Sequence, residues 1–345
     1  MATQRAIVIQ GPGVAKLVND RLIPVLQDDS ILVKTVTVGL NPTDWKHIDF
    51  FAPIEGLLVG CDYAGIVEAV GSKVTKDFQV GDRIAGGAHG SNIVRPEDGT
   101  FAEHIIVKGD LQIKIPDNVT FEQAATLGIG ITTIGQSLYQ NFNLPRVNEL
   151  TKKHGTILIY GGSTATGTLA IQYAKLSGYT VLATSSPRNF ELLKSLGADL
   201  IFDYNDPQVA QKIRKLTDNK LVLAFDTIST AESAQICADA LTTGSGAAYH
   251  ALLHVKFPRD DVKSTMSVYY TQFGRAFKFS DTRIPAKPED FEFAAQFWDE
   301  ARELLATGKL KPHPARVGDG LENVLEGLKD LKENRVSGEK LVYRV

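Results

Sequence analysis

A glycine-rich segment near the middle of the chain has the residue types that bind phosphate groups. It follows the apolar run Thr156–Tyr160 and precedes a helical pattern, Thr164–Ser177. Glycines let the backbone approach a pyrophosphate, and the first turn of a helix offers free N–H groups and the positive end of a dipole. This order predicts a dinucleotide site, although the spacing is not the strict G-x-G-x-x-G and a glycine-rich helix start without a ligand is the alternative. The expected contacts are Gly161, Gly162, Ser163, Thr164, Ala165 and Thr166.

The residues after the next predicted strand, Thr180–Thr184, distinguish between the two nicotinamide cofactors. Sites for NAD usually place Asp or Glu there, to bind the ribose 2′-hydroxyl. This chain instead has Ser185, Ser186 and Arg188, whose hydroxyl and guanidinium groups suit a 2′-phosphate. Tyr204, after the third strand, could stack on the adenine or contact the phosphate. As an alternative, Ser185 is only a helix N-cap and Arg188 an exposed helix residue. The missing acid favours NADPH.

Further strand–helix units follow the glycine-rich segment. The predicted strands are Thr156–Tyr160, Thr180–Thr184, Leu200–Asp203, Leu221–Asp226 and Ala247–Leu253. Strands that alternate with helices of about ten residues are typical of a parallel sheet covered by helices on both faces. The fold class of this part is therefore α/β, with a doubly wound parallel sheet.

The first part of the chain has a different pattern. Ser30–Val38, Ala64–Val70 and Thr100–Val107 have strand patterns, and Gly, Pro, Asn and Asp interrupt them at short spacing. These features predict a compact antiparallel β-barrel-like module. A helical pattern at Phe121–Gln140 is interrupted at Gly128–Gly130. Further helical patterns at Phe291–Leu305 and Leu321–Glu333 and a last strand at Lys340–Arg344 complete the expected elements.

The composition excludes several classes of protein. A length of 345 residues is enough for two domains. The net charge is −3 without a block of like charge, which argues against a nucleic-acid or anionic-lipid partner. Two cysteines, Cys61 and Cys237, cannot form a disulfide framework or a four-thiolate zinc site. With no signal-peptide pattern and no apolar stretch of roughly 20 residues, a reduced cytoplasmic protein is expected.

Several motifs together resemble one superfamily. They are Asn41–His47, Gly60–Asp62, Tyr160–Gly167, Phe202–Tyr204 and Ser337–Val342. On these motifs the chain resembles the medium-chain dehydrogenase/reductase superfamily over nearly its whole length. It is most similar to a zinc-free branch that includes fungal trans-acting enoyl reductases, which partner polyketide synthases, and yeast furfural-type aldehyde reductases. The motifs identify the superfamily and not the substrate.

The resemblance implies a domain organisation and a metal content. A GroES-like catalytic domain would comprise residues 1–122 and 281–345, and a Rossmann NADPH-binding domain residues 123–280. Zinc enzymes of the superfamily place a Cys at the position of Asn41, a His at the position of Cys61, and a further Cys or acid near Ile129–Gly130. Here only Cys61 could ligate, whereas catalytic zinc needs about three protein ligands, so no metal is expected. Many relatives have Gly at the position of Thr164, which leaves the pyrophosphate geometry open.

The resemblance also implies catalytic residues. A reductase must stabilise negative charge on the carbonyl oxygen as the hydride arrives. Lys46 is the first candidate because it follows the turn that forms one wall of the cleft in the superfamily, and Thr133 matches a position that faces the nicotinamide. Tyr63 and His47 are weaker candidates for proton delivery. Lys46 could instead serve binding, and Thr133 could serve only helix packing.

Other reactive side chains have simpler explanations. His89 and His104 flank a turn-rich loop at residues 90–99 that is expected to cover the cleft, and a structural role is the commoner one for each. Cys61 is expected to be a small buried residue, as free cysteines usually are. The cluster of Phe273, Phe277 and Phe279 could line an apolar tunnel or belong to the core.

Three functions remain open at this point. The leading hypothesis is an NADPH-dependent reductase that acts without zinc on the activated C=C bond of an enone or enoyl thioester. Reduction of an aldehyde is the second, and a cofactor-binding relative without catalysis is the third. A synthase that carries the acyl group is a possible partner, and a monomer is favoured over a homodimer that would pair through Thr265–Tyr270.

Overall fold

The structure is a computed structural model that describes residues 2–147, 154–279 and 281–345. It divides into two compact units, unit 1 with Met1–Thr132 and Tyr270–Val345, and unit 2 with Thr133–Tyr269. The domain boundaries predicted from the sequence, 122/123 and 280/281, stay a prediction. In the structure, α2 (Phe121–Ala124) packs on the sheet of unit 1, and Tyr270 hydrogen-bonds Thr43 of the same unit.

Unit 1 is built around a seven-stranded sheet that both ends of the chain supply. The strand order is β16-β17-β3-β4-β5-β7, and β6 also pairs with β3. The strands are β3 (Ser30–Gly39), β4 (Asp62–Val70), β5 (Arg83–Gly87), β6 (His104–Lys108), β7 (Gln112–Lys114), β16 (Ala315–Asp319) and β17 (Lys340–Arg344). Every pair is antiparallel except β16 with β17. The predicted GroES-like module is therefore confirmed, with one parallel pair that the sequence did not predict.

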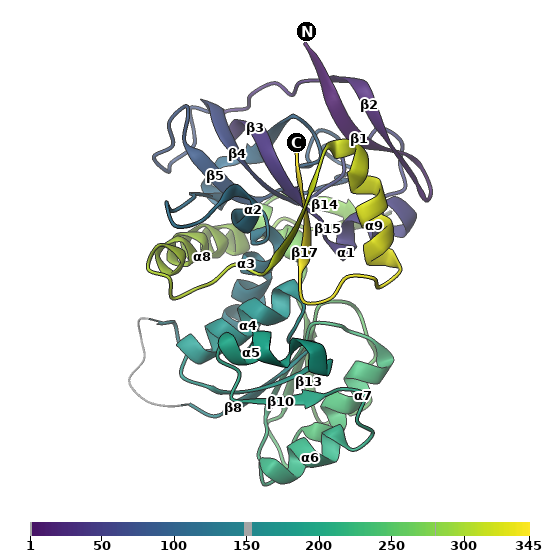
Figure 1. The fold of residues 1–345 in the computed structure, drawn as a ribbon, viewed down its shortest axis with the longest axis vertical. Coiled ribbons are helices and arrows are strands. Elements are labelled where there is room, and N and C mark those ends of the chain that lie inside the picture. The colour runs from purple at the N-terminus through teal and green to yellow at the C-terminus, as the bar shows by residue number, and fades with distance from the viewer. Residues whose placement is uncertain (1, 148–153, 280) are drawn as a thin grey trace. The chain divides into compact units, whose positions relative to one another are not determined.

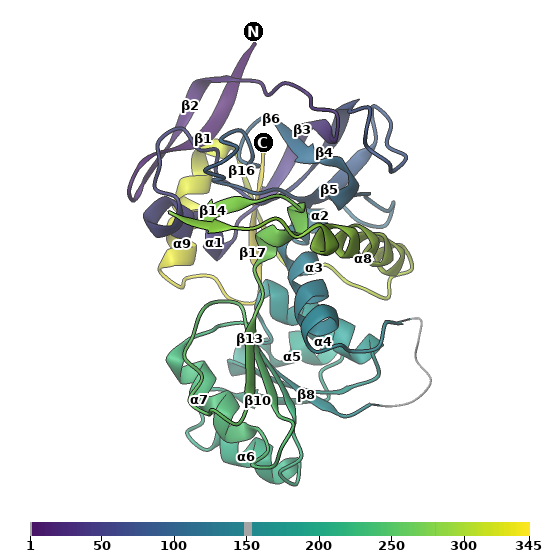
Figure 2. The same ribbon diagram turned by 180° about the vertical axis from the view of Figure 1, so that it is seen from behind.

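The remaining elements of unit 1 surround this sheet (Figures 1 and 2). They are the hairpins β1 (Thr3–Gly11) with β2 (Val14–Leu22) and β14 (Phe277–Phe279) with β15 (Thr282–Ile284), and the helices α1 (Pro42–Lys46), η1 (His47–Phe51), α2, α8 (Pro288–Ala306) and α9 (Val324–Lys332). The interrupted helical pattern at Phe121–Gln140 forms three segments, α2, α3 (Gly128–Ile134) and η3 (Gly135–Asn141). The first interruption lies just before Gly128, which packs closely on β4, since a Cβ there would lie 2.3 Å from Asp62 Oδ1.

Unit 2 is the predicted parallel sheet with one more strand. The order is β10-β9-β8-β11-β12-β13, and all the pairs are parallel. The strands are β8 (Thr156–Tyr160), β9 (Thr180–Ser185), β10 (Leu200–Asp203), β11 (Leu223–Asp226), β12 (Ala248–Ala251) and β13 (Lys263–Met266). The last strand ends before Tyr269–Phe273, which is a 3₁₀ turn, so the edge strand proposed at Thr265–Tyr270 is displaced toward the N-terminus.

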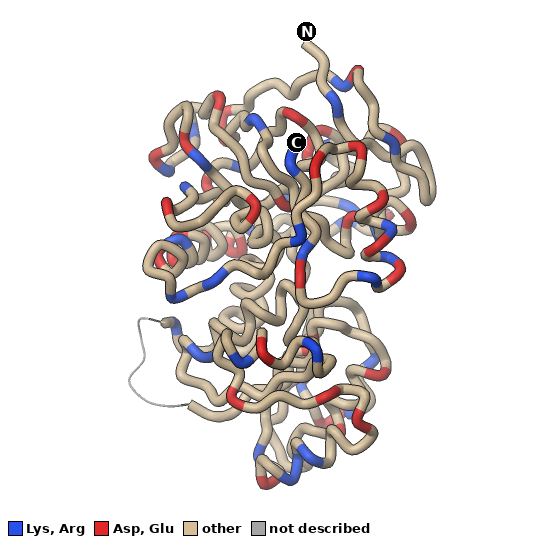
Figure 3. Tube along the Cα trace, viewed as in Figure 1, with Lys and Arg blue, Asp and Glu red and all other residues tan. Residues whose placement is uncertain are grey.

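Helices cover both faces of this sheet (Figures 1 and 2). They are α4 (Ala165–Leu176), α5 (Phe190–Ser195), α6 (Val209–Leu216) and α7 (Ala231–Ala240). The buried faces of α6 and α7 pack on strand residues such as Leu158 and Tyr249. Lys and Arg are mixed with Asp and Glu in each unit (Figure 3). None of the helices in the described part of the chain has both the length and the apolar composition that a membrane crossing needs.

Candidate active site

The glycine-rich loop of unit 2 turns tightly after β8. Gly161 has a φ of 77°, a left-handed conformation that favours glycine, and its N–H donates to Thr184 Oγ1 at 3.1 Å. The N–H of Gly162 donates to the carbonyl oxygen of Thr184 at 2.8 Å. A Cβ on Gly167 would lie 2.3 Å from the Gly161 carbonyl oxygen, so the helix can approach the loop only with glycine there. The loop therefore has the close backbone packing that a dinucleotide site requires.

Thr164 explains how this loop tolerates a residue other than glycine. It is the N-cap of α4 with a φ of −73°, which any residue can adopt. Its hydroxyl accepts the Gly167 N–H at 2.9 Å and lies 3.0 Å from Thr227 Oγ1. The N–H groups of Ala165 and Thr166 lie in the first helical turn, where no intrahelical acceptor exists. These amides and the helix dipole suit a bound anion.

The residues predicted to bind a 2′-phosphate lie at the end of β9 and just after it. Ser185 is buried, and its hydroxyl donates to the Ser186 carbonyl oxygen at 3.0 Å. Ser186 Oγ accepts from Asn189 Nδ2 at 3.3 Å, and Arg188 is exposed on the following turn. Tyr204 is 41% exposed, with its ring centroid 6.5 Å from that of Tyr160. The accessible members of this predicted set are therefore Ser186, Arg188 and Tyr204.

A carboxylate does lie near this position, on the neighbouring strand. Asp203 of β10 pairs in register with Ser185 of β9. Its Oδ1 accepts both the backbone N–H of Asn205 at 2.9 Å and the Asn205 side chain at 3.0 Å. This acid is engaged in its own turn, and the loop after β9 carries no acid of the kind that binds a ribose 2′-hydroxyl.

In unit 1, Lys46 lies at the end of the short helix α1. Asn41 caps this helix, and its N–H donates to Asp44 Oδ2 at 2.7 Å, which fixes the turn. Lys46 is half-buried, with Nζ 5.5 Å from the centroid of the Trp45 ring. Burial lowers the pKa of the Lys46 ammonium, and no carboxylate raises it. This geometry leaves the ammonium group available to an external acceptor.

A chain of polar and aromatic side chains lies beside Lys46. The Tyr270 hydroxyl is 2.9 Å from Thr43 Oγ1, and Thr43 Oγ1 is 3.2 Å from His47 Nδ1. His47 Nδ1 also lies 2.8 Å from the Thr43 carbonyl oxygen, which requires a hydrogen on Nδ1. Burial lowers the pKa of His47 to about 4, so the imidazole is neutral at neutral pH. His47 is therefore a poor acid, although it orders the turn.

A buried ion pair between Lys340 and Asp62 also holds the start of this turn. Lys340 Nζ of β17 donates to Asp62 Oδ2 and to Asn41 Oδ1, the latter at 2.7 Å. Asp62 Oδ1 accepts the backbone N–H of Ile129 at 2.8 Å, at the start of α3. Both charged side chains are at most 4% exposed. Sequence analysis missed this role, because Asp62 and Lys340 are 278 residues apart.

One of the predicted catalytic residues, Tyr63, has different surroundings from those expected. Tyr63 lies in the hydrophobic core of unit 1, is 0% exposed and donates its hydroxyl to Gln112 Oε1 at 2.9 Å. A phenol enclosed in this way cannot exchange a proton with a substrate, so we do not retain Tyr63 as a proton donor. Thr133, near the C-terminal end of α3, is 5% exposed and belongs to unit 2, and its catalytic role stays a prediction. Cys61 is buried as expected, and His104 pairs with Glu68 at 2.8 Å.

The buried carboxyl group of Asp44 should make the stability of the folded protein depend on pH. Burial, together with nearby Asp62, raises the pKa of its carboxyl group to about 8. The folded protein then keeps a proton that the unfolded chain releases above its ordinary pKa of 3.8. Stability therefore falls as the pH rises toward about 8 and levels off above it.

We expect Asp44→Asn to remove this slope, because an amide does not titrate. The slopes of unfolding free energy against pH in the two proteins should differ by no more than about 1.4 kcal/mol per pH unit. The measurement is the free energy of urea unfolding of both proteins at pH values between the two pKa values of Asp44. Asp20→Asn, on the exposed face of β2, is the control and should show the same pH dependence as the wild type. Parallel curves for wild type and Asp44→Asn would show that Asp44 is ionised in the folded protein.

Comparison with known proteins identifies the family. Residues 27–117 match the family described as alcohol dehydrogenase GroES-like domain, and residues 165–272 match the zinc-binding dehydrogenase family. The chain is 48% identical over 347 residues to the trans-enoyl reductase ACTTS2 of Alternaria alternata, with 100% of each chain covered. It belongs to the trans-enoyl reductase family. TOXD of Cochliobolus carbonum, another trans-enoyl reductase, is 57% identical over 277 residues, which are 80% of this chain and 93% of that one.

Solved structures share the fold of this trans-enoyl reductase family member. A quinone oxidoreductase of Pseudomonas syringae superposes with a TM-score of 0.79 at 24% identity, over 99% of this chain and 100% of the other. The CurK enoyl reductase superposes with a TM-score of 0.77 at 20% identity, over 99% of each chain. At these identities the likeness establishes the medium-chain dehydrogenase/reductase fold alone.

The donor set of this family member does not fit a zinc ion, despite the name of one matching family. Asn41 Oδ1, at the first ligand position, accepts a hydrogen bond from Lys340. Burial raises the pKa of the Cys61 thiol, which disfavours the thiolate that zinc binds. Among the described residues no group of three or more His, Cys, Asp or Glu side chains could hold a metal ion. No step of the reaction is therefore assigned to a metal.

Proposed function

We propose that this protein reduces the C=C bond of an α,β-unsaturated thioester or ketone with a hydride from NADPH. The observation that carries the proposal is the half-buried ammonium group of Lys46, together with a glycine-rich loop suited to a dinucleotide. The trans-enoyl reductases among the relatives support the same reaction, since they align over most or all of this chain.

The residues of unit 2 fit the cofactor. The first-turn amides of Ala165 and Thr166 would bind the pyrophosphate, and Ser186 and Arg188 the 2′-phosphate. Tyr204 is exposed near the same strand ends and would contact the adenosine part. When bound, NADPH supplies the hydride.

Residues of the chain then stabilise the charge that the hydride creates. As hydride adds to the β-carbon, the π electrons move to the carbonyl oxygen, which becomes an enolate oxygen. The Lys46 ammonium donates a hydrogen bond to this oxygen, and the Thr133 hydroxyl is a second donor. A proton must then add to the α-carbon. His47 is neutral and holds its Nδ1 hydrogen against Thr43, which leaves Lys46 as the donor that we propose.

A single-turnover assay tests the function. The protein is loaded with NADPH and mixed with an enoyl thioester or, separately, with an aldehyde, and the loss of NADPH absorbance is followed. We expect oxidation with the thioester and a saturated thioester as the product. Turnover of the aldehyde alone would replace enoyl reduction with aldehyde reduction, and no oxidation with either would favour a cofactor-binding relative without catalysis.

The choice of NADPH over NADH predicts the effect of one substitution. Arg188→Ala removes the guanidinium group proposed to bind the 2′-phosphate, so the dissociation constant for NADPH should rise about tenfold. That for NADH should not change, because NADH has no 2′-phosphate. Fluorescence titration with both cofactors measures this, and Lys194→Ala on the following helix is the control. An equal loss of affinity for NADPH and NADH would contradict the role of Arg188 in binding the 2′-phosphate.

We further propose that the enoyl group arrives on a separate synthase and that the protein is a cytoplasmic monomer. The first part of this proposal rests on the resemblance to trans-acting enoyl reductases that partner polyketide synthases. Gel filtration with light scattering tests the oligomeric state. Oxidation of NADPH with the acyl group attached to a carrier domain, compared with the free thioester, tests the need for a partner.

A further inference from the structure

A pocket within unit 1 has features of a binding site that the proposed reaction does not yet use. Its volume is about 360 Å³, within the range of small-molecule sites. The lining includes apolar residues, among them Ile106, Phe273 and Phe277, and polar residues, among them Asn92, Arg95 and Arg275. Phe273 and Phe277 were candidates for an apolar tunnel, and both line this pocket, whereas Phe279 packs on Phe51.

His89 lies in the apolar part of the pocket and has an unsatisfied nitrogen. Its residue is 3% exposed, and Nε2 is buried without a hydrogen-bond partner in the described part of the chain. The ring stacks on Tyr270 at a centroid distance of 4.2 Å and meets Phe277 edge to face at 5.1 Å. A buried polar atom without a partner is costly, so a hydrogen-bond partner for Nε2 would stabilise the ring. Nε2 is enclosed by its neighbours here, and a ligand in the pocket would reach it through a small shift of the ring.

The imidazole of His89 is neutral. Burial, with the nearby His47, lowers the pKa of His89 well below its ordinary value of 6.5. A neutral imidazole donates from one nitrogen and accepts at the other. Its fitting partner is therefore an uncharged hydroxyl or keto oxygen, because no charge on the ring would compensate a buried carboxylate.

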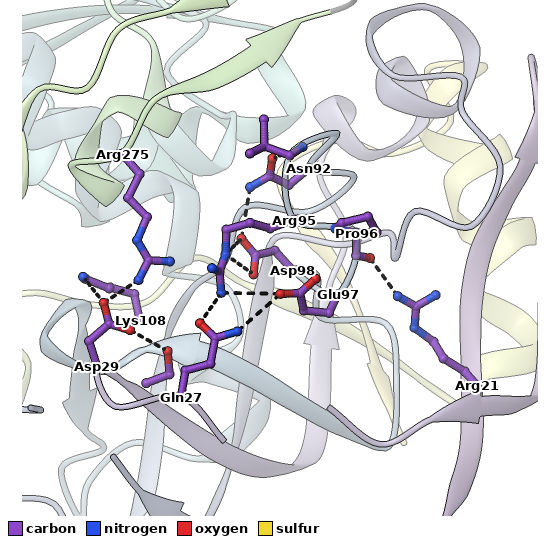
Figure 4. A network of polar contacts seen from close by, with 12 residues as sticks. Arg21, Gln27, Asp29, Asn92, Arg95, Pro96, Glu97, Asp98, Lys108 and Arg275 are labelled. Atoms are coloured by element: carbon purple, nitrogen blue, oxygen red, sulfur yellow. Dashed lines mark hydrogen bonds and ion pairs between the residues drawn. The ribbon is translucent and has the colours of Figure 1, made fainter. Parts of the chain in front are cut away.

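Polar residues that line the pocket belong to a network of ion pairs and hydrogen bonds (Figure 4). Lys108 Nζ and Arg275 both donate to Asp29 Oδ2, so two cations share one carboxylate. Arg95 contacts Asp98 at 3.2 Å and Gln27 at 2.7 Å. These groups satisfy one another, whereas His89 Nε2 has no such partner. The surplus cation on Asp29 disfavours a ligand with a positive charge.

Tyr270 lies between the pocket and the residues around Lys46. Tyr270 stacks on His89 on one side and contacts Thr43 and His47 on the other. Thr43 belongs to α1, the helix that ends at Lys46. One tyrosine therefore separates the pocket from the turn that we propose binds the thioester oxygen.

We propose that this pocket holds the acyl chain of the substrate and that His89 hydrogen-bonds a hydroxyl or keto oxygen on that chain. The proposal rests on the proposed enoyl reduction and adds a specificity-determining residue to it. His89 selects among enoyl substrates according to where the chain carries oxygen, and it takes no part in the bond changes. An apolar wall of Phe273, Phe277 and Ile106 accommodates the hydrocarbon segments.

The test compares substrates that differ in one oxygen atom. The probes are enoyl N-acetylcysteamine thioesters of one chain length, either plain or with a single hydroxyl at successive carbons. We expect wild type to prefer one hydroxylated thioester over the plain one by about three- to tenfold in kcat/KM. His89→Phe keeps the ring stack but should abolish this preference through KM, and His89→Gln should restore part of it. His154→Phe, which replaces a histidine stacked on Tyr179, is the matched control.

The outcomes separate this proposal from the proposed function. The same preference in wild type and His89→Phe would overturn the role of His89, as would an equal loss for all thioesters in both His89 variants. If wild type reduces none of the thioesters, the proposed reaction fails. Calorimetry with the saturated hydroxylated thioester then decides on the pocket, because binding that His89→Phe abolishes would still support it and equal binding would refute it.

Discussion

Replacing Lys46 by Met is expected to lower kcat for the enoyl thioester about a hundredfold to a thousandfold. This is the usual cost of removing one donor that stabilises a developing oxyanion. Methionine retains the aliphatic stem that packs beside Trp45, so the loss reports the ammonium group itself. The affinity for NADPH should not change, because the residues proposed to bind it are all in unit 2.

The chain offers a matched control for this substitution. Lys332 also lies over the Trp45 ring, with Nζ 5.8 Å from the centroid, but its ammonium pairs with Asp49 at 2.7 Å. Lys332→Met should leave kcat unchanged. If Lys46→Met raises KM and spares kcat, Lys46 binds the substrate equally in the ground state and the transition state, and its role in the chemistry is refuted.

The pH profile gives an independent measurement of the same role. Burial lowers the pKa of Lys46 from its ordinary value of 10.5. The ammonium that donates is present below the lowered pKa and is lost as the pH rises through it. We expect kcat in wild type to decline on the alkaline side at a pH below 10.5, and this decline should be absent from the residual activity of Lys46→Met.

The local features of the fold follow from the sequence. Thr156–Tyr160, Leu200–Asp203 and Lys340–Arg344 are strands with the predicted bounds, since each is a short run bounded by turn residues. The strand β13 was displaced in the prediction because Lys263–Met266 is largely exposed at an edge of the sheet and has no apolar run. Strands are predicted from the periodic spacing of buried apolar residues, and an exposed edge strand has few such residues.

The site was predictable where the backbone forms it and not where distant side chains meet. The glycines of the loop and the Asn41 cap act through neighbours in sequence, so their roles could be inferred. The face on which a residue lies could not be, and Tyr63 therefore appeared as a candidate although β4 directs it into the core. The pairing of Asp62 with Lys340 depends on β17 aligning antiparallel to β3, which no local pattern specifies.

That ion pair carries the largest expected effect on stability. Lys340→Met leaves the carboxylate of Asp62 buried without its cation, and breaking a buried pair in this way costs about 3–5 kcal/mol. Urea unfolding should show this loss. Lys73→Met, which breaks the exposed pair with Asp28, should change the unfolding free energy by less than about 1 kcal/mol.

The double variant Asp62→Asn with Lys340→Met separates the charge from the packing. Because it leaves no buried charge uncompensated, it should be less destabilised than the sum of the two single variants. Additive losses would contradict a direct interaction. Asp62 and Lys340 hold both the N-cap of α1, which ends at Lys46, and the first turn of α3, which carries Thr133. A stable double variant with lowered kcat would therefore support a role of this pair in positioning the turn that ends at Lys46.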